Sequence, residues 1–225
     1  MTDQPISFSV AGWRPPPSPR AEPMNGHYCQ LERLDADQHG QALFEAYALD
    51  PDGRNWTYLP QGPFNRHDNF YNWLKGMADM DDPFFFTILD AASQRPIGVA
   101  SYLRITPAAG TIEVGHIHYS PLLQKTRAAS EAMFLMMKRA FALGYRRYEW
   151  KCDALNAPSR RAALRLGFSY EGIFARPRST KNATATQPGT QSSTRSGPNS
   201  KRHLSHGWTR KISTTPANRK PACRH

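Results

Sequence analysis

The sequence contains no acidic residue after Glu171, although the chain continues for another 54 residues. Residues 1–175 hold all 18 acidic side chains and 18 of the 29 lysines and arginines, so this part is formally neutral. The formal net charge of +11 therefore comes entirely from residues 176–225. Because a nucleic-acid-binding domain usually carries its positive charge on the folded body, we rate a basic nucleic-acid-binding protein the least favoured reading.

Cysteine and long apolar runs are also scarce. Cys29, Cys152 and Cys223 are too few and too widely spaced for a disulfide framework or a zinc site. No apolar run is long enough to span a membrane, and residues 1–10 lack the charged-then-apolar pattern of a signal peptide. These absences predict a soluble protein in a reducing, cytoplasmic setting.

Composition divides the chain into three parts. Residues 1–27 include the proline-rich stretch "AGWRPPPSPRAEP", which predicts a stiff, extended arm without a core of its own. Residues 28–175 carry the apolar periodicity of a folded domain. Residues 176–225 have few aliphatic and no acidic side chains, so we expect a basic, disordered tail.

Within residues 28–175, periodicity and end signals predict the elements of one domain. Asp35 is a candidate N-cap for the first helix and Gly144 a candidate C-cap for the third. The order is a strand, two helices, three strands, and then a helix and a strand in alternation. This order predicts a mixed α/β sheet that is antiparallel early and has a helical crossover later. We expect strands at 28–34, 83–90, 96–105, 111–120, 145–153 and 168–174, and helices at 35–49, 67–80, 127–143 and 157–167.

Four features of this domain match a known family. They are "EVGHIHYSP" on the fourth strand, Gln124 at the following turn, "NAPSRRAALRLGFSYEG" near the end, and the aromatic loop "NWTYLPQGPF". Residues 28–175 thus resemble the GNAT N-acetyltransferases, in particular the ribosomal-protein N-terminal acetyltransferases. The resemblance implies a three-layer GNAT-like fold, acetyl-CoA as cosubstrate, and acetyl transfer to a primary amine, either a protein N-terminus or a small amine.

By resemblance, the turn after the fourth strand binds the pyrophosphate of acetyl-CoA. The family's turn carries glycine at its fourth position, where this chain has Arg127. The backbone N–H groups at a helix start can still bind phosphate, and basic side chains can add charge-assisted hydrogen bonds. The alternative is an ordinary helix start with solvated basic residues. The implied cofactor-binding residues are Gln124, Lys125, Thr126, Arg127, Ala128 and Ala129, with the backbone of Ile117 and Tyr119 orienting the thioester.

Asn156 and Ser159 form an N-x-x-S pattern at the start of the last helix. By resemblance, Asn156 contacts the pantetheine arm or the nearby loop backbone, and Ser159 lies where the leaving thiolate is protonated. Both residue types also cap helices for purely local reasons, and this alternative stays open.

Acetyl transfer needs a base for the amine, and the fourth strand offers Glu113, His116 and His118. Strand alternation predicts that Glu113 shares a face with Ile117 and Tyr119, opposite both histidines. We favour His118 as the base because it is nearest the expected thioester, although either histidine could be a plain sheet residue. No third ligand with suitable spacing follows the two histidines, so we expect no metal.

The aromatic loop is too apolar for a solvated connection. The resemblance assigns Trp56, Tyr58, Leu59 and Phe64 to the acceptor pocket, and the alternative is a loop that folds back over the core.

After residue 174 the family continues with a final strand that this chain lacks as written. The codons possible for Ala183 to Pro198 can be read in a shifted frame, in which each new codon joins the third base of one codon to the first two bases of the next. This shifted frame permits the sequence "NRDTAWYSIIDTEWP", which resembles that strand. We therefore predict a sheet without its last strand, and a tail that is out of frame from near Ala175. The main rival function is a noncatalytic acyl-CoA-binding relic of the fold.

Overall fold

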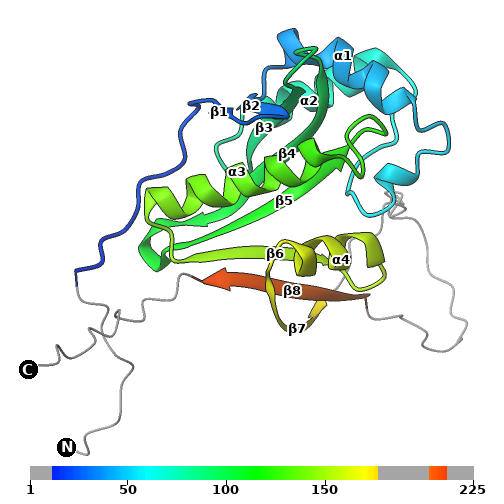
Figure 1. The fold of residues 1–225 in the computed structure, drawn as a ribbon. Coiled ribbons are helices and arrows are strands. Elements are labelled where there is room, and N and C mark those ends of the chain that lie inside the picture. The colour runs from blue at the N-terminus through cyan, green and yellow to red at the C-terminus, as the bar shows by residue number, and fades with distance from the viewer. Residues whose placement is uncertain (1–11, 177–202, 212–225) are drawn as a thin grey trace, which may run out of the picture.

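The computed structural model describes residues 12–176 and 203–211, and they form a mixed sheet covered by helices on both faces (Figure 1). The sheet has eight strands in the order β1-β2-β3-β4-β5-β6-β8-β7. Among the described strands, only β5 and β6 pair in parallel. The strands are β1 Met24–Asn25, β2 Cys29–Arg33, β3 Phe84–Asp90, β4 Pro96–Thr106, β5 Thr111–Tyr119, β6 Arg147–Asp153, β7 Ser169–Arg176 and β8 His203–Lys211.

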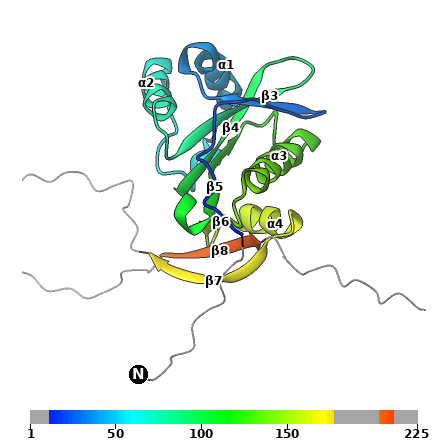
Figure 2. The same ribbon diagram turned by 90° about the vertical axis from the view of Figure 1, so that its left-hand side faces the viewer.

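Four α-helices complete the three layers. Helices α1 (Ala36–Ala48) and α2 (His67–Ala78) cover one face, and α3 (Arg127–Leu143) and α4 (Ala157–Arg165) cover the other (Figure 2). The core under α3 contains a run of methionine side chains, Met133, Met136 and Met137, as expected for packing residues. The core under α1 and α2 is aromatic, and both cores are closed off from solvent.

The predicted helices and strands are confirmed, with small shifts at their ends. Asp35 caps α1, because its Oδ1 accepts hydrogen bonds from the N–H groups of Asp37 and Gln38. Gly144 ends α3 in the left-handed conformation, with φ 104°, which glycine adopts without steric cost. The fold class is therefore the mixed α/β sheet that the residue pattern predicts, in the three layers that the resemblance implies.

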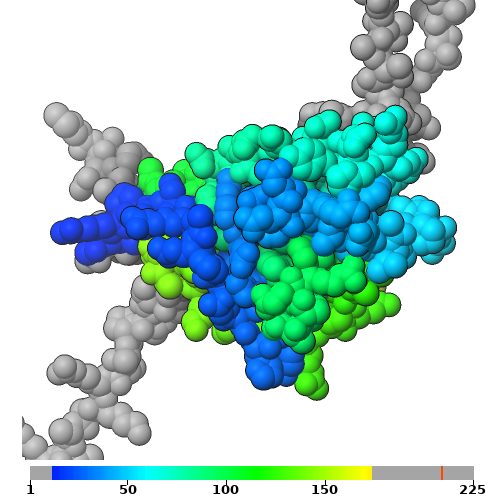
Figure 3. Space-filling view, turned by 90° about the horizontal axis from the view of Figure 1, so that it is seen from above, coloured from blue at the N-terminus to red at the C-terminus, as the bar shows by residue number. Residues whose placement is uncertain are grey.

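The N-terminal arm, as far as it is described from residue 12, lies against the domain. In the space-filling view its dark blue atoms are continuous with the domain surface (Figure 3). Met24 is buried in the core under α3, and β1 adds a short strand to the sheet edge. The described part of the arm thus contributes to the core of the domain.

The last strand of the sheet departs from expectation. The sequence predicts a sheet without it, whereas β8 lies between β6 and β7 and pairs with both in antiparallel fashion. Backbone N–H and C=O groups of β6 and β7 would otherwise be unpaired, and ladder hydrogen bonds form with any non-proline residues. The rest of the predicted tail, residues 177–202 and 212–225, lies outside the described residues.

Within the described ranges, no helix is long and apolar enough to cross a membrane.

Candidate active site

A cavity of about 480 Å³ opens on the α1–α2 side of the sheet, beside β4 and β5. Its wall combines apolar side chains from the aromatic loop with charged side chains from the strands. The lining residues are Tyr58, Leu59, Pro60, Asp82, Pro83, Leu103, Arg104, Glu113, Gly115, His116 and Lys151.

A bulge in β5 decides which side chains reach this cavity. Val99 pairs with His118 and Ser101 pairs with Gly115, so β5 holds one extra residue between these two pairs. His116 adopts φ 47° there, in the left-handed region that is uncommon for a residue with a side chain. Strand alternation predicted that Glu113 and His116 lie on opposite faces of the sheet, and this prediction was wrong. The extra residue places both side chains on one wall of the cavity.

The other side chains of β5 follow from the same bulge. Ile117 and Tyr119 pack against the core under α3, on the opposite face from Glu113. Their backbone lies directly after the bulge, where the β4–β5 ladder resumes at His118. The resemblance assigned this backbone to the thioester, and its position beside the cavity is compatible with that role.

His116 is held in one orientation by Ser101. The His116 Nδ1 atom lies 2.9 Å from the Ser101 Oγ atom, and this hydroxyl donates its own proton to the carbonyl oxygen of Gly115 at 3.2 Å. Since the hydroxyl has a single proton, it accepts from His116, so Nδ1 carries the ring proton and Nε2 keeps a free electron pair. Burial, and then the positive charge of Arg104, lower the pKa of His116 below its usual value, which keeps the ring neutral.

His118 lies outside the large cavity, in a closed aromatic cage. Its ring stacks on Tyr47 at 3.8 Å between centroids and meets Trp56 at 3.9 Å, and it is 2% exposed. Both ring nitrogens are buried without a hydrogen-bond partner among the described residues. Burial lowers the pKa of His118 to about 3. His116 therefore lines the large cavity, whereas His118 is packed among aromatic side chains.

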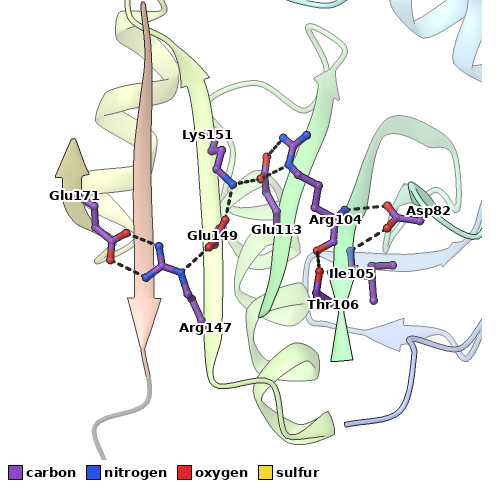
Figure 4. A network of polar contacts seen from close by, with 9 residues as sticks. All are labelled: Asp82, Arg104, Ile105, Thr106, Glu113, Arg147, Glu149, Lys151 and Glu171. Carbon is purple, nitrogen blue, oxygen red and sulfur yellow. Dashed lines mark hydrogen bonds and ion pairs between the residues drawn. The ribbon is translucent and has the colours of Figure 1, made fainter. Parts of the chain in front are cut away.

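Glu113 is part of an ion-pair network with cationic side chains from β4 and β6 (Figure 4). Its carboxylate accepts from Arg104 Nε at 2.7 Å, from Arg104 Nη2 at 2.6 Å, and from Lys151 Nζ at 2.6 Å. Lys151 also pairs with Glu149, which pairs with Arg147. Two cations thus pair with a carboxylate that is 3% exposed, and a catalytic role for Glu113 stays a prediction.

The four predicted pocket residues divide into two pairs. Tyr58 and Leu59 line the large cavity, as the resemblance implied. Trp56 belongs to the aromatic core, and Phe64 packs against it at 5.4 Å between ring centroids. One part of the loop thus lines the cavity and another packs over the core, and the assignment to the acceptor pocket stays a prediction.

The predicted pyrophosphate turn runs into the N-terminus of α3. Thr126 is the N-cap, with Oγ1 accepting from the N–H of Ala129 at 3.2 Å. Lys125 adopts φ 59°, so the left-handed residue of the turn is Lys125 and not Arg127. Gln124 donates to Asn55 and to the Tyr119 carbonyl oxygen. Ala128 and Ala129 are buried, which brings the helix start close to the sheet.

Arg127, the first residue of α3, leans toward the N-terminal arm. Its Nη1 atom donates to the Tyr28 hydroxyl at 3.2 Å, and its guanidinium lies 5.6 Å from the Tyr28 ring centroid. The side chain is exposed, so it remains accessible beside the first N–H groups of the helix.

Asn156 and Ser159 both take part in capping α4. The Asn156 Oδ1 atom accepts from the N–H of Ser159 at 3.1 Å. The Ser159 Oγ atom accepts from the indole N–H of Trp150 at 3.0 Å, so its own proton is directed elsewhere. Capping, the local reading, is observed, and it leaves the amide of Asn156 and the hydroxyl proton of Ser159 available to a ligand.

Sequence reasoning missed Asp82, Arg104 and Lys151, which also line the cavity. A buried glutamate on a strand calls for cationic partners, so Glu113 signalled that such residues exist. Which ones they are depends on the alignment of β4, β5 and β6. The described residues contain no group of three His, Cys, Asp or Glu side chains that could bind a metal ion.

The GNAT acetyltransferase domain family matches residues 30–169. A GCN5-related N-acetyltransferase from Brucella melitensis is 36% identical, with a TM-score of 0.79, over 90% of this chain and 84% of that one. A probable GNAT-family acetyltransferase from Chromobacterium violaceum is 34% identical, with a TM-score of 0.75, over 94% and 96% of the two chains. None of the curated proteins matches.

More distant structures share the fold alone. One is the Salmonella typhimurium acetyltransferase described as modifying the N-terminal serine of ribosomal protein L7/L12, at 18% identity and a TM-score of 0.63, over 85% of this chain and all of that one. The domain match covers more than half of this chain, and the two relatives above are each more than 30% identical over most of it. The chain belongs to the GNAT family of N-acetyltransferases.

Proposed function

We propose that this chain transfers the acetyl group of acetyl-CoA to a primary amine at the bulge of β5, with His116 as the base. One observation carries the proposal: the bulge turns a neutral histidine, oriented by a buried serine, toward a cavity of substrate size.

The coenzyme side of the site rests on the start of α3. The first N–H groups of a helix lack intrahelical partners and favour an anion. Thr126 caps the helix, and the exposed Arg127 and Lys125 add positive charge beside it. A pyrophosphate bound here would direct the pantetheine arm toward β5, with Asn156 and Ser159 on α4 alongside it. One structural neighbour, which shares the fold at 15% identity, was solved with acetyl-CoA and AMP.

The reaction requires one attack and two proton transfers. The amine nitrogen attacks the thioester carbonyl carbon, and His116 Nε2 takes the proton that the amine loses. The carbon–sulfur bond then breaks, and the sulfur leaves as a thiolate. Ser159 is the proposed proton donor to that sulfur, because its oxygen already accepts from Trp150. Ser159 regains a proton from solvent and His116 releases one to solvent, so both side chains return to their starting state. Positioning of the two substrates supplies much of the rate.

The variant His116→Asn tests this assignment, with His118→Asn as the matched control two residues away. We expect His116→Asn to lower kcat at least a hundredfold and to leave the dissociation constant for acetyl-CoA unchanged. Calorimetry measures binding, and release of the coenzyme A thiol on an amine panel measures turnover. Full activity of His116→Asn, or a larger loss in His118→Asn with its fold retained, would contradict the assignment. Binding without turnover on any amine would favour the noncatalytic relic.

A further inference from the structure

The guanidinium of Arg104 presents an unused edge to the cavity. Its Nε and Nη2 atoms bind the Glu113 carboxylate, and its Nη1 atom has no partner among the described residues. The Arg104 side chain is 46% exposed, whereas Glu113 is 3% exposed. The carboxylate therefore lies beneath the guanidinium, and the cationic group is the one that a substrate meets.

The backbone holds this guanidinium in place. Arg104 adopts φ 47°, and its N–H donates to Asp82 Oδ1 at 2.9 Å. The next N–H, from Ile105, donates to Asp82 Oδ2 at 2.9 Å (Figure 4). Both oxygens of Asp82 are thus engaged with the backbone of β4. A guanidinium fixed at both ends loses little conformational freedom when it binds a further anion.

Among the cationic side chains of this network, Arg104 is the one that can bind a further anion. Lys151 is shared between Glu113 and Glu149 and is 20% exposed. Arg147 pairs with Glu149 and Glu171, farther from the cavity. Arg104 alone combines a fixed position, high exposure and a free donor edge within this network.

We propose that Arg104 binds a carboxylate of the acceptor, so that the acceptor is a small amine that also carries a carboxylate, such as an amino acid. This inference rests on the proposed function and narrows its substrate class. Planar guanidinium donors suit a carboxylate, while His116 on the same cavity wall receives the amine. The cavity volume of about 480 Å³ suits a small molecule.

The test compares amino acids with their carboxamides, which keep the side chain and the α-amine but lose the negative charge. The full chain is assayed for coenzyme A thiol release with four such pairs, carrying small, aliphatic, aromatic and polar side chains. A fifth pair, the α-amides of glutamate and glutamine, places the carboxylate on the side chain instead. The amine of a carboxamide is less basic and so more often neutral, which means that a preference for the acid cannot come from amine protonation.

We expect kcat/KM for at least one acid to exceed that of its amide about tenfold or more. Arg104→Gln should lower kcat/KM for that acid about ten- to a hundredfold and leave the amide within about twofold. Arg104→Lys should restore part of the preference, and it also keeps the charge beside Glu113 if Arg104→Gln fails to fold. The control is Arg66→Gln, which changes an exposed arginine that follows the aromatic loop in sequence and does not line the cavity; it should leave kcat/KM for both substrates unchanged.

Equal use of acids and amides, preference for amides, or an equal loss of both in Arg104→Gln would overturn the inference while leaving acetyl transfer established. If no pair is turned over, calorimetry of the coenzyme-A-bound protein with the same pairs measures binding directly. Binding of an acid but not its amide supports the inference, and equal or absent binding overturns it. Failure of the proposed function is a separate result: no acetyl transfer to any amine and no binding of acetyl-CoA.

Discussion

At the β1 edge of the sheet, side chains of α3 bind a segment that composition describes only as an arm. At the β7 edge, a distant piece of chain completes the sheet by pairing with β6 and β7. Glu131 accepts hydrogen bonds from the N–H groups of His27, Tyr28 and Cys29 at 2.6–2.9 Å. Arg139 donates to the Pro23 carbonyl oxygen at 2.9 Å. The β1 edge is thus specified by particular side chains far along the sequence.

The β7 edge is joined differently. β7 ends at Arg176 and β8 begins at His203, so residues 177–202 connect two adjacent antiparallel strands. Such connections usually have two to five residues, and closing a longer one costs conformational entropy. Arg147 pairs with Glu171 across β8, and Thr209 donates to Glu171. The contrast teaches that segments of similar, core-poor composition can be held either by specific side chains or by strand pairing.

The largest expected effect on the difference between the two edges comes from changing the sequence of the strand beside β7. We propose that residues after about Ala175 are read out of frame, because the shifted reading from Ala183 to Pro198 supplies an apolar strand much closer to β7. The corrected chain should be more stable by about 3 kcal/mol, or about 10 °C in Tm. Resequencing the gene from source DNA across the codons for Gly172–Thr190, followed by thermal unfolding of both products, tests this.

A source sequence identical to the frame as written would refute the frameshift. A corrected chain that melts no higher would show that β8 as it stands already suffices at this edge.

The pH dependence of the free energy of unfolding tests whether the centre of the sheet, rather than either edge, limits stability. The pKa of His118 is about 3 in the fold because of burial, against an unfolded value near 6.5. Between pH 6.5 and pH 3, His118 is therefore protonated in the unfolded state but not in the folded state. The free energy of unfolding falls as the pH drops through this range. At pH 4.5 this costs about 2.5 kcal/mol.

The variant His118→Leu should lack the contribution of His118 to this pH dependence. Urea unfolding at pH 7 and pH 4.5 measures the difference in the free energy of unfolding for each protein. His27→Asn, which changes an exposed histidine, is the control. The same slope in wild type and His118→Leu would mean that the ring is accessible to protons. His39 and His116, whose pKa values are also lowered by burial, contribute equally to both proteins.

Glu131→Ala tests the side-chain anchor of the β1 edge. It removes three charge-assisted hydrogen bonds to a partly exposed backbone, so we expect a loss of about 2 kcal/mol. Cys29 gives a local reading, because its thiol is fully buried and burial, followed by the nearby Glu131 charge, raises its pKa to about 12. Thiol labelling of Cys29, followed by peptide mass spectrometry, should speed up in the variant. Glu45→Ala, which removes an exposed ion pair with Arg95, should leave the labelling rate unchanged, and equal rates in all three proteins would exclude the anchor.

Arg147→Ala should have the smallest effect, about 1 kcal/mol, because its ion pairs with Glu149 and Glu171 are partly exposed. The loss should be larger in the frame-corrected chain if a tighter strand buries the pair. Thermal unfolding of the variant in both backgrounds measures this, with Arg95→Ala as the exposed control. Equal losses of stability in the two backgrounds would show that the ion pairs of Arg147 do not depend on the strand between β6 and β7.

Much of the fold could be predicted from local signals. Asp35 and Gly144 mark helix ends through chemistry that needs no distant partner, and the apolar periods give the strands their faces. The candidate site was only half predictable. Tyr58 and Leu59 line the cavity and Thr126 caps α3, but the position of His116 beside Glu113 was not predictable, because a one-residue bulge cannot be read from strand alternation.

The sequence by itself determined the order of elements, the family resemblance, the neutral body and the unusual end of the chain, since these depend on residue type and spacing. The tertiary structure alone decided that His116 and not His118 faces the cavity, and that Glu113 is neutralised by Arg104 and Lys151. It also decided that Glu131 holds the arm. Each of these depends on strand register or on contacts between residues far apart in the chain, and such alignments are set by how whole layers pack.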